Sequence, residues 1–422
     1  MIFSALLVAT CVLLVFTAKR DVKLGIYLTL FALPSYLIRF HIGPIPFTLL
    51  EVFVLIVFVL CIVRKESRQT LLEVVRSDRL FLLGVCLLIA GAIGVVVSPD
   101  GLAALGSFRA YFFEPLLFYV VIRSQIKSPA DVEHALMALG ASAIVTSIFA
   151  LIQWITGLGI PIPWDIEHRV TSFYDFPNAV GLFLGPIVTI AALLTLQPGT
   201  TPGVVSSNKQ RGFWAIVTIL GMLAILAAKT EAAYVAIPAS LFIIALAHFP
   251  SLQKRGRRWS SFALAAVAVL GIVVALAITP VRQKLTLNDY SGEVRRTQWS
   301  ETIAMLKDRP VFGAGLSGYP ITFKPYHDAT WIEIFQYPHN IVLNIWSELG
   351  LLGLLIFVFL ALQTLRLVRG STDLFSLVIF GALVEMTIHG FVDVPYFKND
   401  LALMTWALLG LLVITRRAPE SD

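Results

Sequence analysis

The stretch SGEVRRTQWSETIAMLKDRPVFGAGLSGYP, residues 291–320, lies in the only long polar interruption of an otherwise apolar sequence. Within it, Trp299, Ile303 and Leu306 recur at a helical spacing. This spacing predicts an amphipathic helix whose apolar face lies against a membrane surface. The residues DRP at 308–310 should end that helix, and the glycines that follow let the backbone turn sharply.

The polar interruption leads into YPHNIVLNIWSELGLLG, residues 337–353, which begins polar and continues as an apolar run. His339 stands at the predicted boundary between water and lipid. Asn340, Asn344 and Glu348 follow at a spacing of four residues, which places them along one side of a helix. A histidine followed by aligned polar residues indicates a site rather than a simple connector.

The composition is that of a polytopic membrane protein. Hydrophobic residues make up 58% of the chain, charged residues 14%, and the mean hydropathy is +0.84. These values lie outside the usual range of soluble globular proteins. A chain of 422 residues has room for about a dozen helices of about 20 residues. We therefore expect an all-α fold of about 12 or 13 transmembrane helices and no separate soluble domain.

The apolar runs predict where these spans lie. The predicted spans are residues 2–18, 22–40, 46–63, 79–97, 105–122, 134–156, 177–197, 212–228, 232–248, 260–279, 340–365, 374–391 and 401–415. They divide the chain into N-terminal transmembrane helices at 1–279, a loop of short amphipathic helices at 280–339, and C-terminal helices with a short cytoplasmic tail at 340–422. The first segment is either a full span or a peripheral or re-entrant helix.

The distribution of basic residues predicts the orientation. Of the 32 lysines and arginines, most lie in short connections on one side of the predicted membrane. That side should be the cytoplasm, because short cytoplasmic loops carry the excess of basic residues. The loop at 280–339 is also basic, but long loops cross the membrane regardless of charge. The sequence thus predicts that this loop faces the outside.

The order of motifs resembles the O-antigen ligase and polymerase family of bacterial envelope glycosyltransferases. The shared order is an arginine with a tryptophan four residues later, P-V-F-G-A-G, H-N at the head of a span, and E-L-G-L-L-G. Residues 161–181 and 389–400 also resemble family segments. The resemblance implies a GT-C-type helical bundle in the bacterial inner membrane. It also implies a periplasmic active site that moves a glycan from an undecaprenyl-diphosphate carrier.

One position departs from the family pattern. Family members often carry serine and arginine at the head of a middle span, where this chain has AKTEAAY with Thr230 and Glu231. If the family arginine holds the diphosphate, this protein supplies the charge elsewhere, for example from Lys229, or takes a different donor.

Three arginines are candidate ligands of the donor diphosphate. Arg169 and Arg295 come from different outer connections, and Arg296 is an auxiliary candidate. An arginine binds two phosphate oxygens at once and stays ionised near lipid, so it suits the charge that develops on a departing diphosphate. The alternative is that these side chains only extend from the apolar region to the interface.

His339 is the candidate general base. The acceptor hydroxyl is a poor nucleophile until its proton is removed, and histidine is suited to that role. The alternative is a histidine that only hydrogen-bonds to backbone at a helix end. Asn340, Trp299 and His327 are further candidate substrate-binding residues.

The sequence gives no support for a metal, a cofactor or a nucleic acid. No D-x-D motif occurs, and the acidic residues of the long loop are scattered. The net charge of +6 is explained by topology, because excess lysine and arginine in membrane proteins marks the cytoplasmic loops. We therefore expect an inverting, metal-independent transferase whose partners are the lipid-linked donor, a lipid- or sugar-linked acceptor and membrane lipids.

Two other functions remain open at this stage. A polymerase of the same family would add the glycan to another lipid-linked repeat. A transporter or lipid flippase would instead place paired charges at the middle of the membrane. The sequence disfavours the transporter, because Glu51, Glu114 and Glu231 are expected near the ends of spans.

Overall fold

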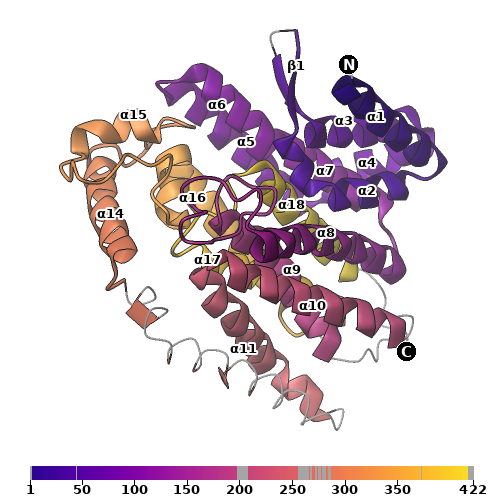
Figure 1. Ribbon diagram of the computed structural model, residues 1–422. Coiled ribbons are helices and arrows are strands. Elements are labelled where there is room, and N and C mark those ends of the chain that lie inside the picture. The colour runs from indigo at the N-terminus through magenta and orange to yellow at the C-terminus, as the bar shows by residue number, and fades with distance from the viewer. Residues whose placement is uncertain are drawn as a thin grey trace.

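The computed structural model describes residues 2–43, 45–196, 208–254, 287–371 and 373–416, together with a few isolated positions between 266 and 283. Helices make up most of this part of the chain (Figure 1). The predicted span at 260–279 falls outside the described ranges. The elements are α1 (Ile2–Arg20), α2 (Val22–Phe31), η1 (Leu33–Leu37), β1 (Arg39–Ile42), β2 (Ile45–Thr48), α3 (Leu49–Val63), α4 (Lys65–Ser77), α5 (Arg79–Val97), α6 (Gly101–Phe108), η2 (Arg109–Phe113), α7 (Glu114–Gln125), α8 (Pro129–Thr156), α9 (Asn178–Leu196), α10 (Asn208–Ala228), α11 (Glu231–Lys254), α14 (Tyr290–Asp308), α15 (Tyr319–Phe323), η3 (Lys324–Tyr326), α16 (Ile341–Val368), α17 (Leu374–His389) and α18 (Asn399–Thr415).

The expectation of an all-α polytopic membrane protein is confirmed. Within the described residues, six helical segments are long and apolar enough to cross a membrane: Arg79–Val97, Gly101–Gln125, Pro129–Thr156, Asn178–Leu196, Asn208–Ala228 and Ile341–Val368. Shorter apolar helices include α2, α3, α17 and α18. The total of 12 or 13 spans and the likeness to the GT-C type stay predictions.

Local sequence signals explain several helix ends. Ser128 and Asp131 form a capping box at the start of α8, where Pro129 occupies the first helical position. Gly157 ends the same helix in the left-handed conformation. Thr48 and Glu51 form a second capping box at the start of α3. The helices therefore begin and end where their own residues satisfy the terminal backbone groups.

The structure contradicts two predicted spans in part. The C-terminal end of the span at 22–40 and the N-terminal end of the span at 46–63 are not helical extensions of α2 and α3. α2 stops early, and β1 and β2 form an antiparallel hairpin that projects from the bundle (Figure 1). Pro34 cannot donate the backbone hydrogen bond that would continue the helix. Beyond it, apolar and polar residues alternate in the manner of a strand, and Phe40 and Phe47 stack across the hairpin.

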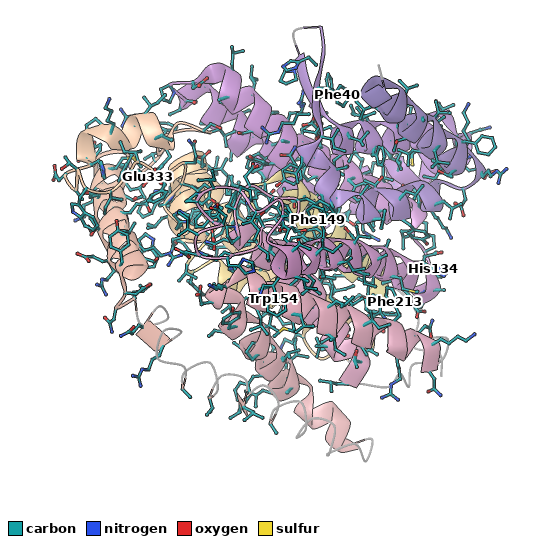
Figure 2. The ribbon with its side chains drawn as sticks, viewed as in Figure 1. Phe40, His134, Phe149, Trp154, Phe213 and Glu333 are labelled. Atoms are coloured by element: carbon teal, nitrogen blue, oxygen red, sulfur yellow. The ribbon has the colours of Figure 1, made fainter. Side chains whose placement is uncertain are left out.

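The connections rich in lysine and arginine meet at one end of the bundle. Lys23 pairs with Asp131 at 2.9 Å, and Arg123 pairs with Asp78 at 3.0 Å, so the α1–α2, α4–α5 and α7–α8 connections lie close together. Figure 2 shows Glu333 of the long loop far from His134, which lies in the first turns of α8 at this basic end. The connections in which the sequence shows an excess of lysine and arginine therefore lie together at one end of the helical bundle.

The predicted amphipathic helix is present as α14 and ends at Asp308, before Pro310. Its buried face agrees with the predicted one only in part, because Leu306 is fully buried and Trp299 partly buried. Ile303 is 43% exposed, whereas Gln298 and Thr302 are buried. The helix lies on a small core of the loop itself, and it buries polar side chains because their partners are other loop residues.

Glu114 also departs from the sequence analysis. It lies in the middle of the continuous helical segment Gly101–Gln125 rather than near a span end. Arg109 pairs with it at 3.3 Å and with Glu51 at 3.0 Å. The same guanidinium donates to the carbonyl of Pro46, so this buried charge group fixes the β-hairpin to the bundle.

The orientation can be tested by labelling. Glu333→Cys should react with a membrane-impermeant thiol reagent in intact cells, because the exposed side chain lies in the predicted outer loop. Glu66→Cys, exposed on α4 at the basic end, should react only after lysis. The three native cysteines are first replaced by alanine. If Glu66→Cys reacted in intact cells and Glu333→Cys reacted only after lysis, the protein would have the opposite orientation in the membrane.

Candidate active site

His339 lies at the end of the long loop, directly before α16. Its backbone adopts a φ of 47°, a conformation that residues other than glycine rarely adopt. Asn340 follows as the N-cap of α16, and its side chain accepts hydrogen bonds from the amides of Val342 and Leu343. The imidazole packs against the rings of Phe335 and Tyr337. The turn thus directs the histidine away from the helix axis while its neighbour caps the helix.

The partner of His339 is Asp393, from the connection between α17 and α18. His339 Nδ1 lies 3.5 Å from Asp393 Oδ1, and the carboxylate is only 3% exposed. Burial alone would raise the pKa of Asp393, but the nearby imidazole of His339 outweighs burial through its charge and lowers that pKa well below its ordinary value. The arrangement therefore favours a carboxylate that faces one ring nitrogen of a histidine.

A chain of hydrogen bonds extends from this pair to Arg169. Asn178, the first residue of α9, donates to Asp393 Oδ2 at 3.2 Å. Its side-chain oxygen accepts from Arg169 Nη2, also at 3.2 Å. We name His339, Asp393, Asn178 and Arg169 the polar chain. It links three connections that are distant in sequence, and it brings two of the predicted site residues into one cluster.

Arg169 has a second role that the sequence did not indicate. Its Nε donates to the carbonyl of Ala228 and its Nη2 to that of Lys229, so the guanidinium covers the C-terminal end of α10. The ring of Trp164 packs against it, and Glu167 lies 3.8 Å from Nη1. Nη1 is consequently the edge that remains for a ligand.

The two neighbouring arginines of α14 differ in position. Arg295 is partly buried, and its Nε has no hydrogen-bond partner among the described residues. It shares a helix face with Gln298 and Trp299, which donate to the carbonyls of residues 337 and 338, directly before His339. Arg296 is exposed and donates to the carbonyl of Leu287. Of the two, Arg295 is on the face toward the polar chain.

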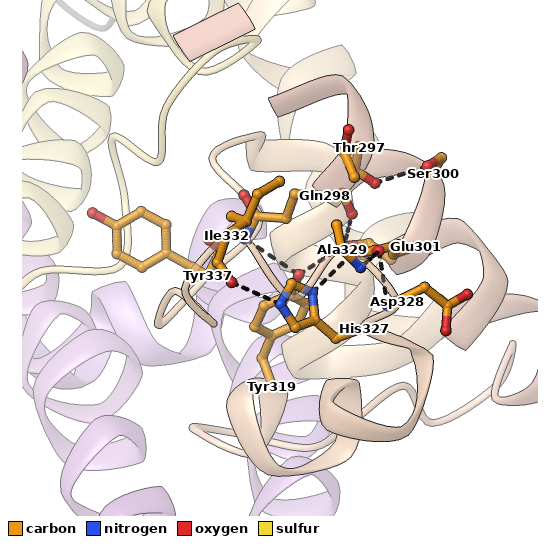
Figure 3. A network of polar contacts seen from close by, with 11 residues as sticks. Thr297, Gln298, Ser300, Glu301, Tyr319, His327, Asp328, Ala329, Ile332 and Tyr337 are labelled. Carbon is orange, nitrogen blue, oxygen red and sulfur yellow. Dashed lines mark hydrogen bonds and ion pairs between the residues drawn. The ribbon is translucent and has the colours of Figure 1, made fainter. Parts of the chain in front are cut away.

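His327 is held within the loop (Figure 3). Its two ring nitrogens contact Glu301 Oε2 at 3.0 Å and the carbonyl of Ile332 at 2.8 Å. Burial opposes the charged imidazole, but Glu301 and that carbonyl raise the pKa of His327. Both nitrogens are occupied, so in this conformation His327 secures the loop on α14 rather than facing a substrate.

The loop is attached to the membrane helices through a break in α16. At Gly350 the backbone leaves the helix with φ 65° and ψ −168°, a combination available essentially only to glycine. In a regular helix the amide of Leu351 would donate to the carbonyl of Ser347. Here Leu351 donates to Val311 and Ser347 accepts from Ala314. The P-V-F-G-A-G segment therefore replaces the missing helical hydrogen bond with two of its own.

A buried carboxylate reinforces this attachment. Glu348 Oε2 accepts from the amide of Ser317 at 2.6 Å. On the other side of the loop, Leu316 donates to the carbonyl of Gly94 in α5, and Ser98 Oγ donates to the carbonyl of Leu316. Glu348 is thus a structural anchor in this conformation.

Lys229 and Thr230 lie directly before α11, which begins at Glu231. Lys229 Nζ donates to the carbonyl of Glu167, and Thr230 is buried against Gly181. Lys229 thereby stabilises the connection that carries Arg169. His389 Nδ1 and Glu385 Oε1 form a further pair, 3.2 Å apart within α17.

The part of the chain that the structure describes contains no group of three histidine, cysteine or acidic side chains that could hold a metal ion. The metal-independent mechanism stays a prediction.

With this geometry established, comparison with known proteins identifies the central part of the chain. Residues 216–358 match the family model described as O-Antigen ligase. This part of the chain is therefore similar to O-antigen ligases. The match confirms the resemblance at 291–353 and supports an O-antigen ligase-like role in polysaccharide assembly. It does not reach Arg169 or Asp393. No curated protein matches the chain.

Sequence reasoning missed Asp393 and Asn178. Both lie in segments that were recognised, D-F-P-N before α9 and H-G-F-V-D-V after α17. An aspartate and an asparagine within two residues of a proline are typical of turns, so residue type alone gave no signal of a shared contact. Only their predicted position on the same membrane face as His339 pointed to it.

The break in α16 gives a test of the domain's construction. A Cβ at residue 350 would lie 2.1 Å from the carbonyl oxygen of Val311, so Gly350→Ala should lower stability by at least about 1–3 kcal/mol. Gly212→Ala, in α10 with open space around it, is the matched control and should be neutral. The measurement is the melting temperature of purified protein. Equal melting of Gly350→Ala and the parent would show that the break is not required.

Proposed function

We propose that the protein is an inverting, metal-independent glycosyltransferase. It moves a glycan from an undecaprenyl-diphosphate carrier to a hydroxyl of a lipid- or sugar-linked acceptor. The polar chain is the observation that supports this most directly, because it joins a candidate base to a cation beside it. The site would face the periplasm, in a multi-pass protein of the bacterial inner membrane that takes part in lipopolysaccharide or other surface-polysaccharide assembly.

In the proposed reaction, His339 Nε2 takes the proton of the acceptor hydroxyl. Asp393 faces Nδ1, which favours the tautomer with an unprotonated Nε2 and stabilises the imidazolium that forms. The acceptor oxygen bonds to the anomeric carbon as the bond to the diphosphate oxygen breaks. A single displacement inverts the configuration at that carbon.

The departing diphosphate takes the electron pair of the broken bond and becomes more negative. Arg295 Nε has no hydrogen-bond partner in the described part of the chain, and Arg169 Nη1 lies 3.8 Å from Glu167, farther than a hydrogen bond. Donors already fixed in place stabilise developing charge effectively. The two arginines would therefore act mainly on the leaving group, and Asn340 and Trp299 would position His339 through their hydrogen bonds on either side of it in the chain.

The direct test uses purified protein, a lipid-diphosphate glycan and candidate acceptors, with mass spectrometry of the product. Transfer to a glycan-free lipid acceptor supports the ligase, and extension of a lipid-linked repeat supports the polymerase. Excess chelator should leave the rate unchanged. A rate lost to chelation and restored by magnesium or manganese contradicts metal independence, and movement of the intact lipid without transfer supports a flippase.

His339→Ala should bind the lipid-linked donor almost normally yet lose transfer by about two to four orders of magnitude, the contribution of a positioned general base. Single-turnover kinetics and donor binding are measured separately. His168→Ala, a histidine exposed in another outer connection, is the matched control and should retain activity. Parallel loss of binding and transfer would make His339 a donor ligand or a cap instead.

The adjacent arginines form a natural pair. Arg295→Ala should weaken donor binding by roughly tenfold or more, because a charge-assisted contact contributes about 1.5–3 kcal/mol. Arg296→Ala, on the exposed side of α14, should change it little. If the two substitutions changed the dissociation constant of the donor equally, the proposal that Arg295 rather than Arg296 contacts the donor would be wrong.

A further inference from the structure

Lys398, the residue directly before α18, has a buried ammonium group without a hydrogen-bond acceptor in the described part of the chain. Its Nζ lacks a hydrogen-bond partner in the described residues. The contact that it makes is with the ring of Phe176, whose centroid lies 3.7 Å away. An ammonium has three donors and is strongly hydrated. Burying one without an acceptor is unfavourable, so this position calls for a ligand with acceptor oxygens.

The charged groups around Lys398 hold it in place but do not accept from it. Asp393, Asp400 and Asp175 favour its charged form, whereas burial lowers the pKa of Lys398 to about 8. The first two carboxylates have other donors. Asp393 is engaged by His339 and Asn178, and Asp400 accepts from the hydroxyl of Tyr174 at 3.2 Å and from a backbone amide.

The position of Lys398 ties it to the polar chain. Phe176, its ring partner, lies two residues before Asn178 in the same connection. Lys398 itself lies five residues after Asp393, in the connection that supplies this carboxylate. Both segments that surround the ammonium therefore also carry members of the polar chain.

We propose that Lys398 is a phosphate-binding residue of this site, whose Nζ donates to an oxygen of the lipid-linked diphosphate. This inference rests on the proposed function, because it assigns part of the donor. A diphosphate carries several negative charges, and Arg169 already spends Nε and Nη2 on protein acceptors. A compact ammonium supplies a second charge without requiring the planar geometry of a guanidinium.

The test measures binding of two probes, inorganic pyrophosphate and a short-chain polyprenyl diphosphate, to the purified full-length protein. Lys398→Met keeps the apolar stem and removes the charge, and it should weaken binding of the polyprenyl probe by about tenfold or more. Lys398→Arg should retain binding. Lys307→Met, an exposed lysine on α14, is the matched control. Melting temperatures show whether each variant is folded.

The pH profile adds a readout that a structural role would not change. Parental binding should weaken as the pH rises through about 8, where the ammonium loses its proton. Lys398→Arg should lack that step, since arginine stays charged. His339 and the three aspartates also face this region, so the step must disappear specifically with the lysine.

The outcomes separate this inference from the proposed function. Parental binding of pyrophosphate as well as of the polyprenyl probe, both weakened in Lys398→Met, supports recognition of the phosphate itself. Loss confined to the polyprenyl probe supports recognition at the lipid surface. Unchanged binding by Lys398→Met, with Arg295→Ala impaired, overturns the role of Lys398 and leaves the proposed function intact. A parent that binds neither probe overturns both.

Discussion

The construction of this domain depends on one exchange of hydrogen bonds at the break in α16. Opening a helix inside a membrane protein leaves a carbonyl and an amide without partners, and no water is present in lipid to satisfy them. Ser347 and Leu351 are satisfied by Ala314 and Val311 of the loop. The break and the loop therefore require each other, and this requirement explains why P-V-F-G-A-G and E-L-G occur in the same sequence.

This attachment also sets the position of the histidine. The loop contacts α16 after its first turns and contacts α5 through Leu316 and Ser98, so α14 is held over the beginning of α16 (Figure 1). The face of α14 with Gln298 and Trp299 then fixes residues 337 and 338. His339 is thereby placed by a rigid surface rather than by a free loop, as a general base requires.

The sequence predicted the parts of the fold that follow from hydropathy. The spans at 79–97 and 374–391 agree closely with α5 and α17, because long apolar runs permit few other structures in lipid. The sequence did not predict the features that depend on contacts between distant segments. The side of α14 that is buried, and the meeting of Asn178 with Asp393, depend on partners that no local pattern specifies. Within the site, the candidates His339 and Arg169 followed from chemistry and motif, whereas their linkage required the structure.

The origin of the polar chain in separate connections has a consequence for inheritance. The long loop brings His339, but Asp393 and Arg169 belong to connections elsewhere in the chain. A loop exchanged by recombination between two such proteins would carry the histidine without the aspartate that lies against it. Diversification of substrate range should then proceed by gradual substitution around a conserved frame, or by transfer of the whole coding sequence.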